Sequence, residues 1–335
     1  MPVRTQLRTG KRVALKTGSV AGFRSSFENR TCLFNTGTPP CLTQERPRGD
    51  CINGRLLRDS PSLTGLKVFI RQARVTDKDS AVSEFGNLDS LTAVVTGSSS
   101  GIGRAIALEL AAAGADVVVH CHQSIEQAEK VAAEIRSVGR RSAVIQGDVG
   151  DAENLSQLVD AAWNALGGVD VWVNNAGVDL LTSDKAKLSY ADKLEALLDI
   201  DVRSAVLLSK LVGERLAAQG RGSILNIGWD QSDRGMGGDS GELFATAKNA
   251  IMGFTRSLAV SLAPTIRVNC IAPGWIRTAW GEQASDPWQE RVLKETPLNR
   301  WGTPEDIAKL ARFLVSPDAS YITGQVINCN GGAVR

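Results

Sequence analysis

The sequence is poor in the residues that build metal centres, membrane spans and phenol-dependent active sites. Its 335 residues include two histidines, and none of its six cysteines form a Cys-x-x-Cys pair, which argues against a zinc site. It has no apolar run of about 18 residues, so we expect no membrane span. Its only tyrosines are Tyr190 and Tyr321, and any reaction that needs a phenol is limited to these two.

Charge is distributed unevenly along the chain. Residues 1–75 hold 14 Lys and Arg against 4 Asp and Glu, a net charge of +10, whereas the rest holds 24 against 32, a net charge of −8. An acidic body argues against nucleic acid as the main partner. Cys121, Cys270 and Cys329 are predicted to be small core residues of a reduced protein, which favours a cytoplasmic location. A disulfide among Cys32, Cys41 and Cys51 stays open.

Residues 1–86 are predicted to form a flexible basic leader. They show no sustained helical or strand period and are rich in Arg, Thr, Ser, Gly and Pro. A transit peptide for organelle import and an over-long gene model both stay open, although no methionine between Met1 and Met236 offers a later start. A nucleic-acid or membrane-surface arm is disfavoured, because the basic residues are scattered.

The rest of the chain, residues 87–335, alternates apolar strands with helices. Strands are predicted at 91–95, 115–119, 142–145, 169–173, 223–227, 266–270 and 325–329, and helices at 102–113, 125–138, 152–166, 187–218 and 242–262. Continuous apolar strands separated by helices indicate a parallel sheet that is covered on both faces. The predicted fold class is therefore α/β, a doubly wound seven-stranded parallel sheet of the Rossmann type.

A glycine-rich loop follows the first predicted strand and leads into a helix. It consists of Thr96, Gly97, Ser98, Ser99, Ser100, Gly101, Ile102 and Gly103. The three glycines permit a tight turn, close approach of the backbone to a pyrophosphate, and close packing of helix on sheet. The helix start offers free N–H groups to phosphates. This context predicts a dinucleotide-binding loop.

Further motifs make the sequence resemble the short-chain dehydrogenase/reductase family, and in particular 3-oxoacyl-acyl-carrier-protein reductases. They lie at residues 147–149 (Gly-Asp-Val), 174–177 (Asn-Asn-Ala-Gly), 267–269 (Arg-Val-Asn), 273–278 (Pro-Gly-Trp-Ile-Arg-Thr), 297–306 and 321–325. The resemblance covers residues 89–335. It implies hydride transfer between a nicotinamide cofactor and a carbonyl or alcohol substrate.

The resemblance also implies which residues hold the cofactor. Asp148 and Val149 are expected beside the adenine. Asn174, Ala176 and Gly177 are expected to flank its ribose and brace the sheet. Pro273, Gly274, Ile276 and Thr278 are expected at the nicotinamide, and Lys248 at its ribose.

The end of the second strand favours NADP(H) over NAD(H). NAD enzymes place an acid there for the ribose 2′-hydroxyl, but residues 120–124 read His-Cys-His-Gln-Ser. We expect His122 or Arg104 near a 2′-phosphate. A metal held by His120 and His122 is disfavoured, and we predict none.

The residues that carry the family's proton chemistry are largely replaced. The resemblance puts Phe244 where the family has its proton-donating Tyr, Trp229 at the Ser and Asp201 at the helix Asn, whereas Lys248 is retained. Neither tyrosine of the chain is followed by Lys at the required spacing. Ser232 or Ser240 folding back, and Asp230 as a substitute acid, stay open.

Two functions therefore compete. One is an oxidoreductase with a weak or non-standard mechanism, and the other is a cofactor-binding pseudoenzyme that acts as a sensor or partner subunit. A scaffold with an empty cofactor site is disfavoured by the intact glycine-rich loop. The resemblance implies a homotetramer or dimer paired through residues 194–216 and 251–262, with a small molecule as ligand. The aromatic residues Trp229, Phe244, Trp275, Trp280 and Trp288 are expected at the substrate cleft, either stacking a ligand or filling the space.

Overall fold

The computed structural model describes residues 84–335. They form a sheet of seven parallel strands in the order β3-β2-β1-β4-β5-β6-β7. The strands are β1 (Thr92–Val95), β2 (Asp116–Cys121), β3 (Ser142–Gln146), β4 (Val171–Asn174), β5 (Gly222–Ile227), β6 (Ile266–Pro273) and β7 (Val326–Cys329). The predicted doubly wound sheet is confirmed, and its chain order reverses between β1 and β4.

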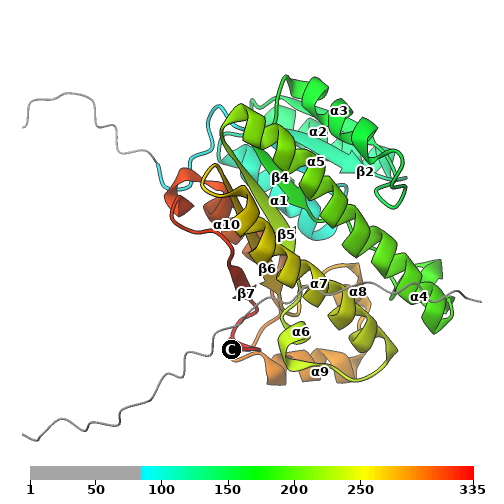
Figure 1. Cartoon of the computed structure of the whole chain (residues 1–335). Coiled ribbons are helices and arrows are strands. Elements are labelled where there is room, and N and C mark those ends of the chain that lie inside the picture. The colour runs from blue at the N-terminus through cyan, green and yellow to red at the C-terminus, as the bar shows by residue number, and fades with distance from the viewer. Residues whose placement is uncertain (1–83) are drawn as a thin grey trace, which may run out of the picture. The chain divides into compact units, whose positions relative to one another are not determined.

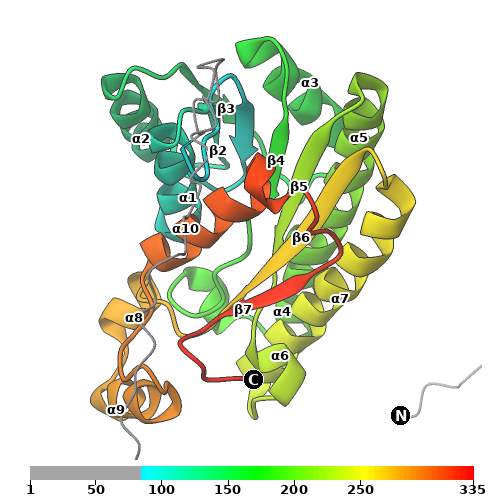
Figure 2. The same cartoon turned by 90° about the vertical axis from the view of Figure 1, so that its left-hand side faces the viewer.

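Helices cover both faces of the sheet, as Figure 2 shows. One face carries α1 (Gly101–Ala112), α2 (Ile125–Ser137) and α10 (Pro304–Val315), and the other carries α3 (Leu155–Leu166), α5 (Ser204–Gln219) and α7 (Asp239–Leu262). Each face has its own apolar cluster, one around Ile106 and Val119 and the other around Leu158 and Trp172. Burial of β1 and β2 on both sides explains their continuous apolar sequences.

Short helices gather where the strands end. They are α4 (Tyr190–Leu197), α6 (Gln231–Arg234), α8 (Ala279–Gln283) and α9 (Asp286–Glu295), and they lie in the lower part of Figure 1. Because all the strands are parallel, the segments that follow them meet at one edge of the sheet, which is where ligands bind in folds of this kind.

The long helical region predicted over residues 187–218 is confirmed from Tyr190 onward, but it begins three residues later and contains a π-helical turn. A 3₁₀ turn spans Asp184–Lys187, and α4 begins at Tyr190 because the Ser189 side chain caps it. A π-helical turn, Leu198–Arg203, then separates α4 from α5. A π-helical turn contains one more residue than an α-helical turn. The sequence does not reveal it, because the apolar pattern continues on either side of the turn.

The sequence interpretation did not anticipate α6, α8, α9 or α10. The α10 helix carries recognisable start signals, since Thr303 and Asp306 form a capping box and Pro304 occupies the first turn. The others are short, and α6 and α8 have no side-chain cap. None of the described helices is both long and apolar enough to cross a membrane.

Only the last three residues of the predicted leader are described, so residues 1–83 lie outside the structure's description. Phe85 stacks on Phe313 of α10, with ring centroids 5.6 Å apart. Arg312 donates hydrogen bonds to the Phe85 and Gly86 carbonyls at 3.0 and 2.9 Å. These contacts attach the start of the described body to α10.

Candidate active site

A cleft of about 730 Å³ opens at the carboxyl ends of the strands. It brings together the four residues expected at the positions of the family's proton chemistry with the glycine-rich loop and the segment after β6. The predicted site residues that line it are Ser100, Gly101, Ile102, Gly177, Asp201, Trp229, Phe244, Lys248, Pro273, Gly274, Ile276 and Thr278. The predicted cofactor residues that do not line it are Thr96, Gly97, Ser98, Ser99, Gly103, His122, Asp148, Val149, Asn174 and Ala176.

The glycine-rich loop needs its glycines for steric reasons. Gly97 has φ +62°, and a Cβ there would come within 2.8 Å of the Ala176 backbone. A Cβ on Gly103 would come within 2.4 Å of the Gly97 carbonyl oxygen. The α1 helix begins at Gly101 with no side-chain cap and no acidic residue in its first turn. Its first N–H groups therefore lack helical partners, and this arrangement fits the pyrophosphate of a dinucleotide.

His120, which the sequence raised only as a disfavoured metal ligand, fixes the shape of the loop. Its Nδ1 accepts a hydrogen bond from the Gly97 N–H at 3.0 Å, so its Nε2 carries the proton and donates to the Gly147 carbonyl at 3.2 Å. The His120 N–H donates to Ser98 Oγ at 3.0 Å. Burial lowers the pKa of His120 to about 4. A neutral imidazole thus joins the loop after β1 to the end of β3.

A second set of hydrogen bonds joins the loop to the end of β4. Thr96 Oγ1 accepts from the N–H groups of Asn175 and Ala176, at 2.9 and 3.0 Å. The Asn175 side chain donates to the carbonyls of Thr96 and Gly97 at 2.9 and 3.1 Å. Asn175 also lines the cleft. It was quoted in a motif but not predicted as a site residue, although its place directly after β4, between the predicted residues Asn174 and Ala176, is a signal that could have identified it.

Asn174 braces the sheet from within. Its side-chain amide donates to Ser209 Oγ and Asn226 Oδ1, both at 2.8 Å, and its carbonyl oxygen accepts from Trp172 Nε1 at 2.8 Å. These partners occupy the side chain inside the protein, so it supports the sheet and does not reach the cleft.

The residues expected near the adenine lie at the ends of β2 and β3. His122 Nε2 is 3.6 Å from Asp148 Oδ2. Arg104, the other candidate for a 2′-phosphate, makes two contacts with Glu134 of α2, at 2.9 and 2.7 Å. Of the two predicted phosphate partners, Arg104 is therefore already paired with a carboxylate.

At the expected catalytic positions, Lys248 is paired with Asp201, the residue expected at the position of the family's Asn. Lys248 Nζ lies 2.9 Å from Asp201 Oδ1, and the Asp201 side chain is only 2% exposed. The other carboxylate oxygen accepts a hydrogen bond from the Val178 N–H at 2.9 Å. There is no room for a side chain at Gly177, because a Cβ there would come within 2.9 Å of Asp201. The π-helical turn carries Asp201 into this position.

The positions where the family's Tyr and Ser were expected hold two aromatic rings in contact. The centroids of Trp229 and Phe244 are 6.2 Å apart and their planes are inclined by 68°. Both rings line the cleft. Gly228, which precedes the tryptophan, lies so close to Met252 that a Cβ would come within 2.8 Å of it. An indole and a phenyl ring offer neither the hydroxyl nor the phenol of the family.

The possible substitutes for these groups are placed differently from one another. Ser240 lines the cleft, whereas Ser232 and Asp230 are buried and do not line it. Burial raises the pKa of the Asp230 carboxyl to about 6, and Asn330 donates to its Oδ2 at 3.0 Å. The expectation that Asp230 lies near the substrate as an acid is not supported by this arrangement, because its side chain faces Asn330 inside the protein.

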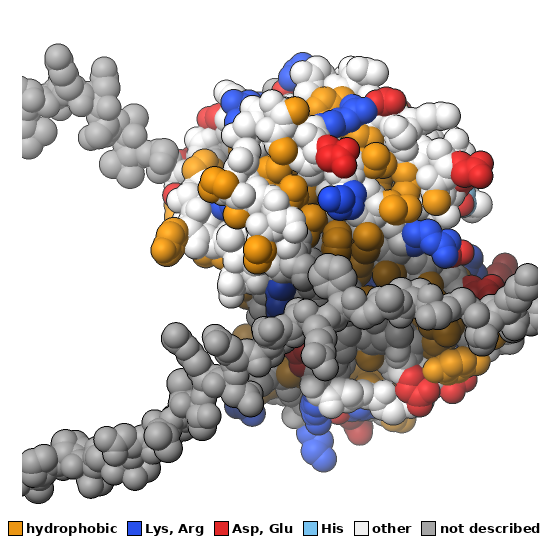
Figure 3. Space-filling model, in the orientation of Figure 1, with side chains coloured by type: hydrophobic (Ala, Val, Ile, Leu, Met, Phe, Trp, Pro, Cys, Tyr) orange, Lys and Arg blue, Asp and Glu red, His pale blue; other side chains and the backbone are white. Residues whose placement is uncertain are grey.

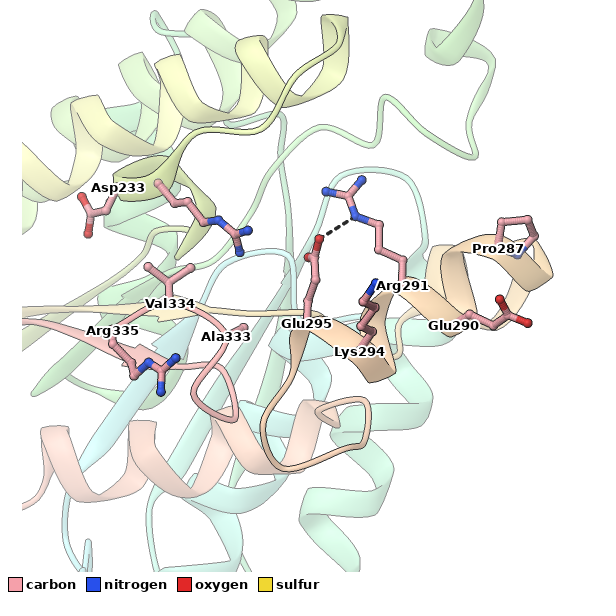
Figure 4. A pocket seen from close by; sticks show the side chains of 10 residues that line it. Asp233, Pro287, Glu290, Arg291, Lys294, Glu295, Ala333, Val334 and Arg335 are labelled. Carbon is pink, nitrogen blue, oxygen red and sulfur yellow. Dashed lines mark hydrogen bonds and ion pairs between the residues drawn. The ribbon is translucent and has the colours of Figure 1, made fainter.

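A second cavity, of about 980 Å³, lies beside α9 and contains none of the predicted site residues. Charged side chains dominate its lining, and Figure 4 shows Arg291 and Glu295 pointing toward one another. No cluster of three potential metal ligands occurs among residues 84–335.

Comparisons with known proteins agree with this geometry. Residues 97–334 match the family model described as enoyl-(acyl carrier protein) reductase. The 3-oxoacyl-[acyl-carrier-protein] reductase of Synechocystis sp. is 38% identical over 251 residues, which cover 74% of this chain and 98% of that protein. The chain belongs to the short-chain dehydrogenase/reductase family.

Solved structures show the same likeness. A 7α-hydroxysteroid dehydrogenase with NADH and 7-oxo glycochenodeoxycholic acid has a TM-score of 0.68 at 35% identity, covering 74% of this chain and 96% of that one. A gluconate 5-dehydrogenase from Burkholderia cenocepacia with NADP and tartrate has a TM-score of 0.67 at 27% identity, with the same coverage. NAD(P)-dependent hydride transfer is the activity of this family.

Proposed function

We propose that this protein binds NADP(H) and transfers hydride without the family's Tyr–Ser–Asn proton route. The observation that carries the proposal is the Trp229–Phe244 contact beside the Lys248–Asp201 pair, in a cleft whose glycine-rich loop is intact. Loss of a positioned general acid costs about 10²–10⁴ in rate. Reduction by the standard route is therefore expected to be slow.

Residues of the chain supply the binding groups and the remaining proton donors. When bound, the cofactor supplies or accepts the hydride. The first turn of α1 would hold its pyrophosphate, and Ile276 and Thr278, which line the cleft, would hold its nicotinamide end. Carbonyl reduction also needs a proton at the substrate oxygen. Among the described residues lining the cleft, Lys248 is the only Lys or Arg, and Ser240 offers a hydroxyl.

NADP(H) is favoured over NAD(H) by the residues after β2. His122 follows the strand at the place where an acid would bind a ribose 2′-hydroxyl. No carboxylate occurs in residues 120–124 to repel a 2′-phosphate. Arg104 is held by Glu134 at 2.7 Å, whereas His122 lies 3.6 Å from Asp148, so His122 is the less tightly paired of the two candidates.

A cofactor-binding sensor or partner subunit is the second candidate function. It is favoured by the same contact, because the two rings stand where the substrate oxygen would be polarised and protonated. Fluorescence titration of the purified full chain with NADPH and NADH, with assays on ketones and 3-oxoacyl thioesters, separates the two. Any turnover above the rate without the protein supports the oxidoreductase, and turnover above ~1 s⁻¹ means that another residue donates the proton. Tight NADPH binding without turnover supports the sensor, and absence of binding overturns both.

We also propose that the protein forms a homo-oligomer through α5 and α7. Leu207 of α5 is 37% exposed and Val260 of α7 is 80% exposed. Figure 3 shows hydrophobic side chains between charged ones on the face that carries α5 in Figure 1. Val260→Lys is expected to lower the mass measured by light scattering. Val138→Lys at the C-cap of α2, where the valine is 59% exposed, is the matched control and should leave the mass unchanged.

A further inference from the structure

Four tryptophans pack together at the cleft. The ring centroid of Trp280 lies 6.0 Å from that of Trp275, 5.5 Å from that of Trp288 and 5.9 Å from that of Trp301. Trp275 and Trp301 are buried, whereas Trp280 and Trp288 are half-buried. Trp275, Trp280 and Trp288 line the cleft, which retains a volume of about 730 Å³. The cluster therefore presents aromatic surface to an open space.

Charged residues of α9 hold these rings in place. The Arg291 guanidinium lies 4.6 Å from the ring centroid of Trp288 and 5.9 Å from that of Trp275. Glu295 accepts hydrogen bonds from Arg291 at 2.8 Å and from Trp275 Nε1 at 3.3 Å, and Figure 4 shows the Arg291–Glu295 contact. An aromatic surface fixed in advance binds a ring without the cost of ordering its side chains.

A second aromatic pair bounds the same cleft. Trp229 and Phe244 come from the loop after β5 and from α7, and their rings meet edge to face. Met236 also lines the space, and its flexible side chain can adapt to an adjacent ring. Rings on two separate segments suit a flat ligand, because stacked or edge-on aromatic contacts contribute ~0.5–1.5 kcal/mol each beyond burial.

The charges of the cleft disfavour an anionic ligand. Its described lining contains three carboxylates (Asp179, Asp201 and Asp239) and one cation, Lys248. Lys248 is paired with Asp201, which leaves two carboxylates. Burial tends to raise the pKa of Asp179, but hydrogen bonds from Thr182 outweigh it and lower that pKa. These two carboxylates come from the segments after β4 and at the start of α7, apart from the first turn of α1 where the cofactor's pyrophosphate would bind, and they disfavour a negatively charged substrate.

We propose that the substrate end of the cleft takes a planar aromatic ketone or alcohol without negative charge, which stacks on one of Trp280 and Trp288 and meets the other edge-on, since their planes are inclined by 75°. The inference rests on the proposed function, because it names the substrate class of the same cleft. In this arrangement the tryptophans form a binding surface that side chains of α9 hold in place, and they leave the cleft open.

The test is a binding comparison of three ketones by titration calorimetry on the full chain in the presence of NADPH. The planar neutral probe is 2-acetylnaphthalene, its anionic counterpart is 6-acetyl-2-naphthoate, and its non-planar counterpart is cyclohexyl methyl ketone. We expect 2-acetylnaphthalene to bind at least about tenfold more tightly than either counterpart. Equal or tighter binding of either counterpart, or no binding of 2-acetylnaphthalene, overturns the inference.

Variants test the position of the ligand. Trp280→Leu and Trp288→Leu are each expected to weaken 2-acetylnaphthalene about tenfold, with the affinity for NADPH as the check on folding. Trp163→Leu is the matched control, because Trp163 stacks on Trp172 and does not line the cleft. If both cleft variants bind the probe like the wild type, the inference is wrong.

The NADPH titration distinguishes the two proposals. Binding of NADPH without binding of the aromatic ketone refutes the substrate class and leaves the proposed function standing. Failure of both cofactors to bind refutes the proposed function itself.

Discussion

The ammonium group of Lys248 lies 2.9 Å from a carboxylate oxygen of Asp201, within a site where the family has an uncharged amide. Asp201 gives the ammonium group of Lys248 a partner of opposite charge inside the protein. It also joins α7 to the π-helical turn before α5, and through the second oxygen of Asp201 it reaches the Val178 backbone. The retained lysine thus has a structural partner that the family pattern does not provide.

Asp201→Asn is expected to destabilise the fold although it restores the family's residue. The amide can still accept from the Val178 N–H, but Lys248 loses its charged partner, so the free energy of unfolding should fall by roughly 1.5–3 kcal/mol. Urea unfolding measures this. Asp201→Asn combined with Lys248→Met should cost less than the sum of the single changes; additive losses would contradict the pairing.

Phe244→Tyr tests whether the proton-donating phenol is the only group that the site lacks for carbonyl reduction. A phenol four residues before Lys248 should raise kcat/KM for carbonyl reduction by about 10²–10⁴, and Phe244→Leu serves as a control without a hydroxyl. If the single change gives no gain, Trp229→Ser is added to remove the neighbouring indole. A double variant no faster than the wild type would show that the lost acid is not what limits the rate.

His120 makes stability depend on pH in one direction. Its pKa is lowered from 6.5 to about 4 by burial in the folded state, so its contribution is fully present above pH 6.5 and is lost as the pH falls through 4. The loss amounts to about 3 kcal/mol, as an order of magnitude. His120→Gln should remove this part of the profile.

Asp230 changes the stability with pH in the opposite sense to His120, over an overlapping pH range. Its pKa is raised from 3.8 to about 6, so its contribution is present below pH 3.8 and is lost as the pH rises through 6. The two groups therefore oppose each other between pH 4 and 6. In Asp230→Asn, denaturation at pH 4, 5, 6 and 7 should show stability falling more steeply toward pH 4 than in the wild type. A parallel profile would refute the assignment.

His122→Asp tests the cofactor preference. A carboxylate after β2 should weaken NADPH binding and favour NADH, changing the ratio of their dissociation constants by about tenfold or more. His122→Gln removes the imidazole without adding charge and separates repulsion from loss of a partner. An unchanged ratio in His122→Asp would place the 2′-phosphate elsewhere.

Local patterns were enough to predict the sheet and much of the site. The strands each carry a run of apolar residues, and the Tyr-x-x-x-Lys spacing of the family, counted back from Lys248, located Phe244, which the structure places in the cleft. The role of His120 was not predictable, because it depends on Gly97 and Gly147, which are 23 and 27 residues away. The Lys248–Asp201 pair was missed for the same reason, since it forms only when α7 packs against the π-helical turn.

The π-helical turn at Leu198–Arg203 has a consequence for the register of the helices around it. Each residue advances an α-helix by about 100°, so one extra residue per turn rotates α5 relative to α4 by a similar angle. Deleting one residue within this turn would let α4 and α5 join as a continuous helix. Asp201 would then rotate away from Lys248 while the outer faces of both helices kept their composition. The position of the acid in the cleft is therefore set by a count of residues as well as by the identity of the residue.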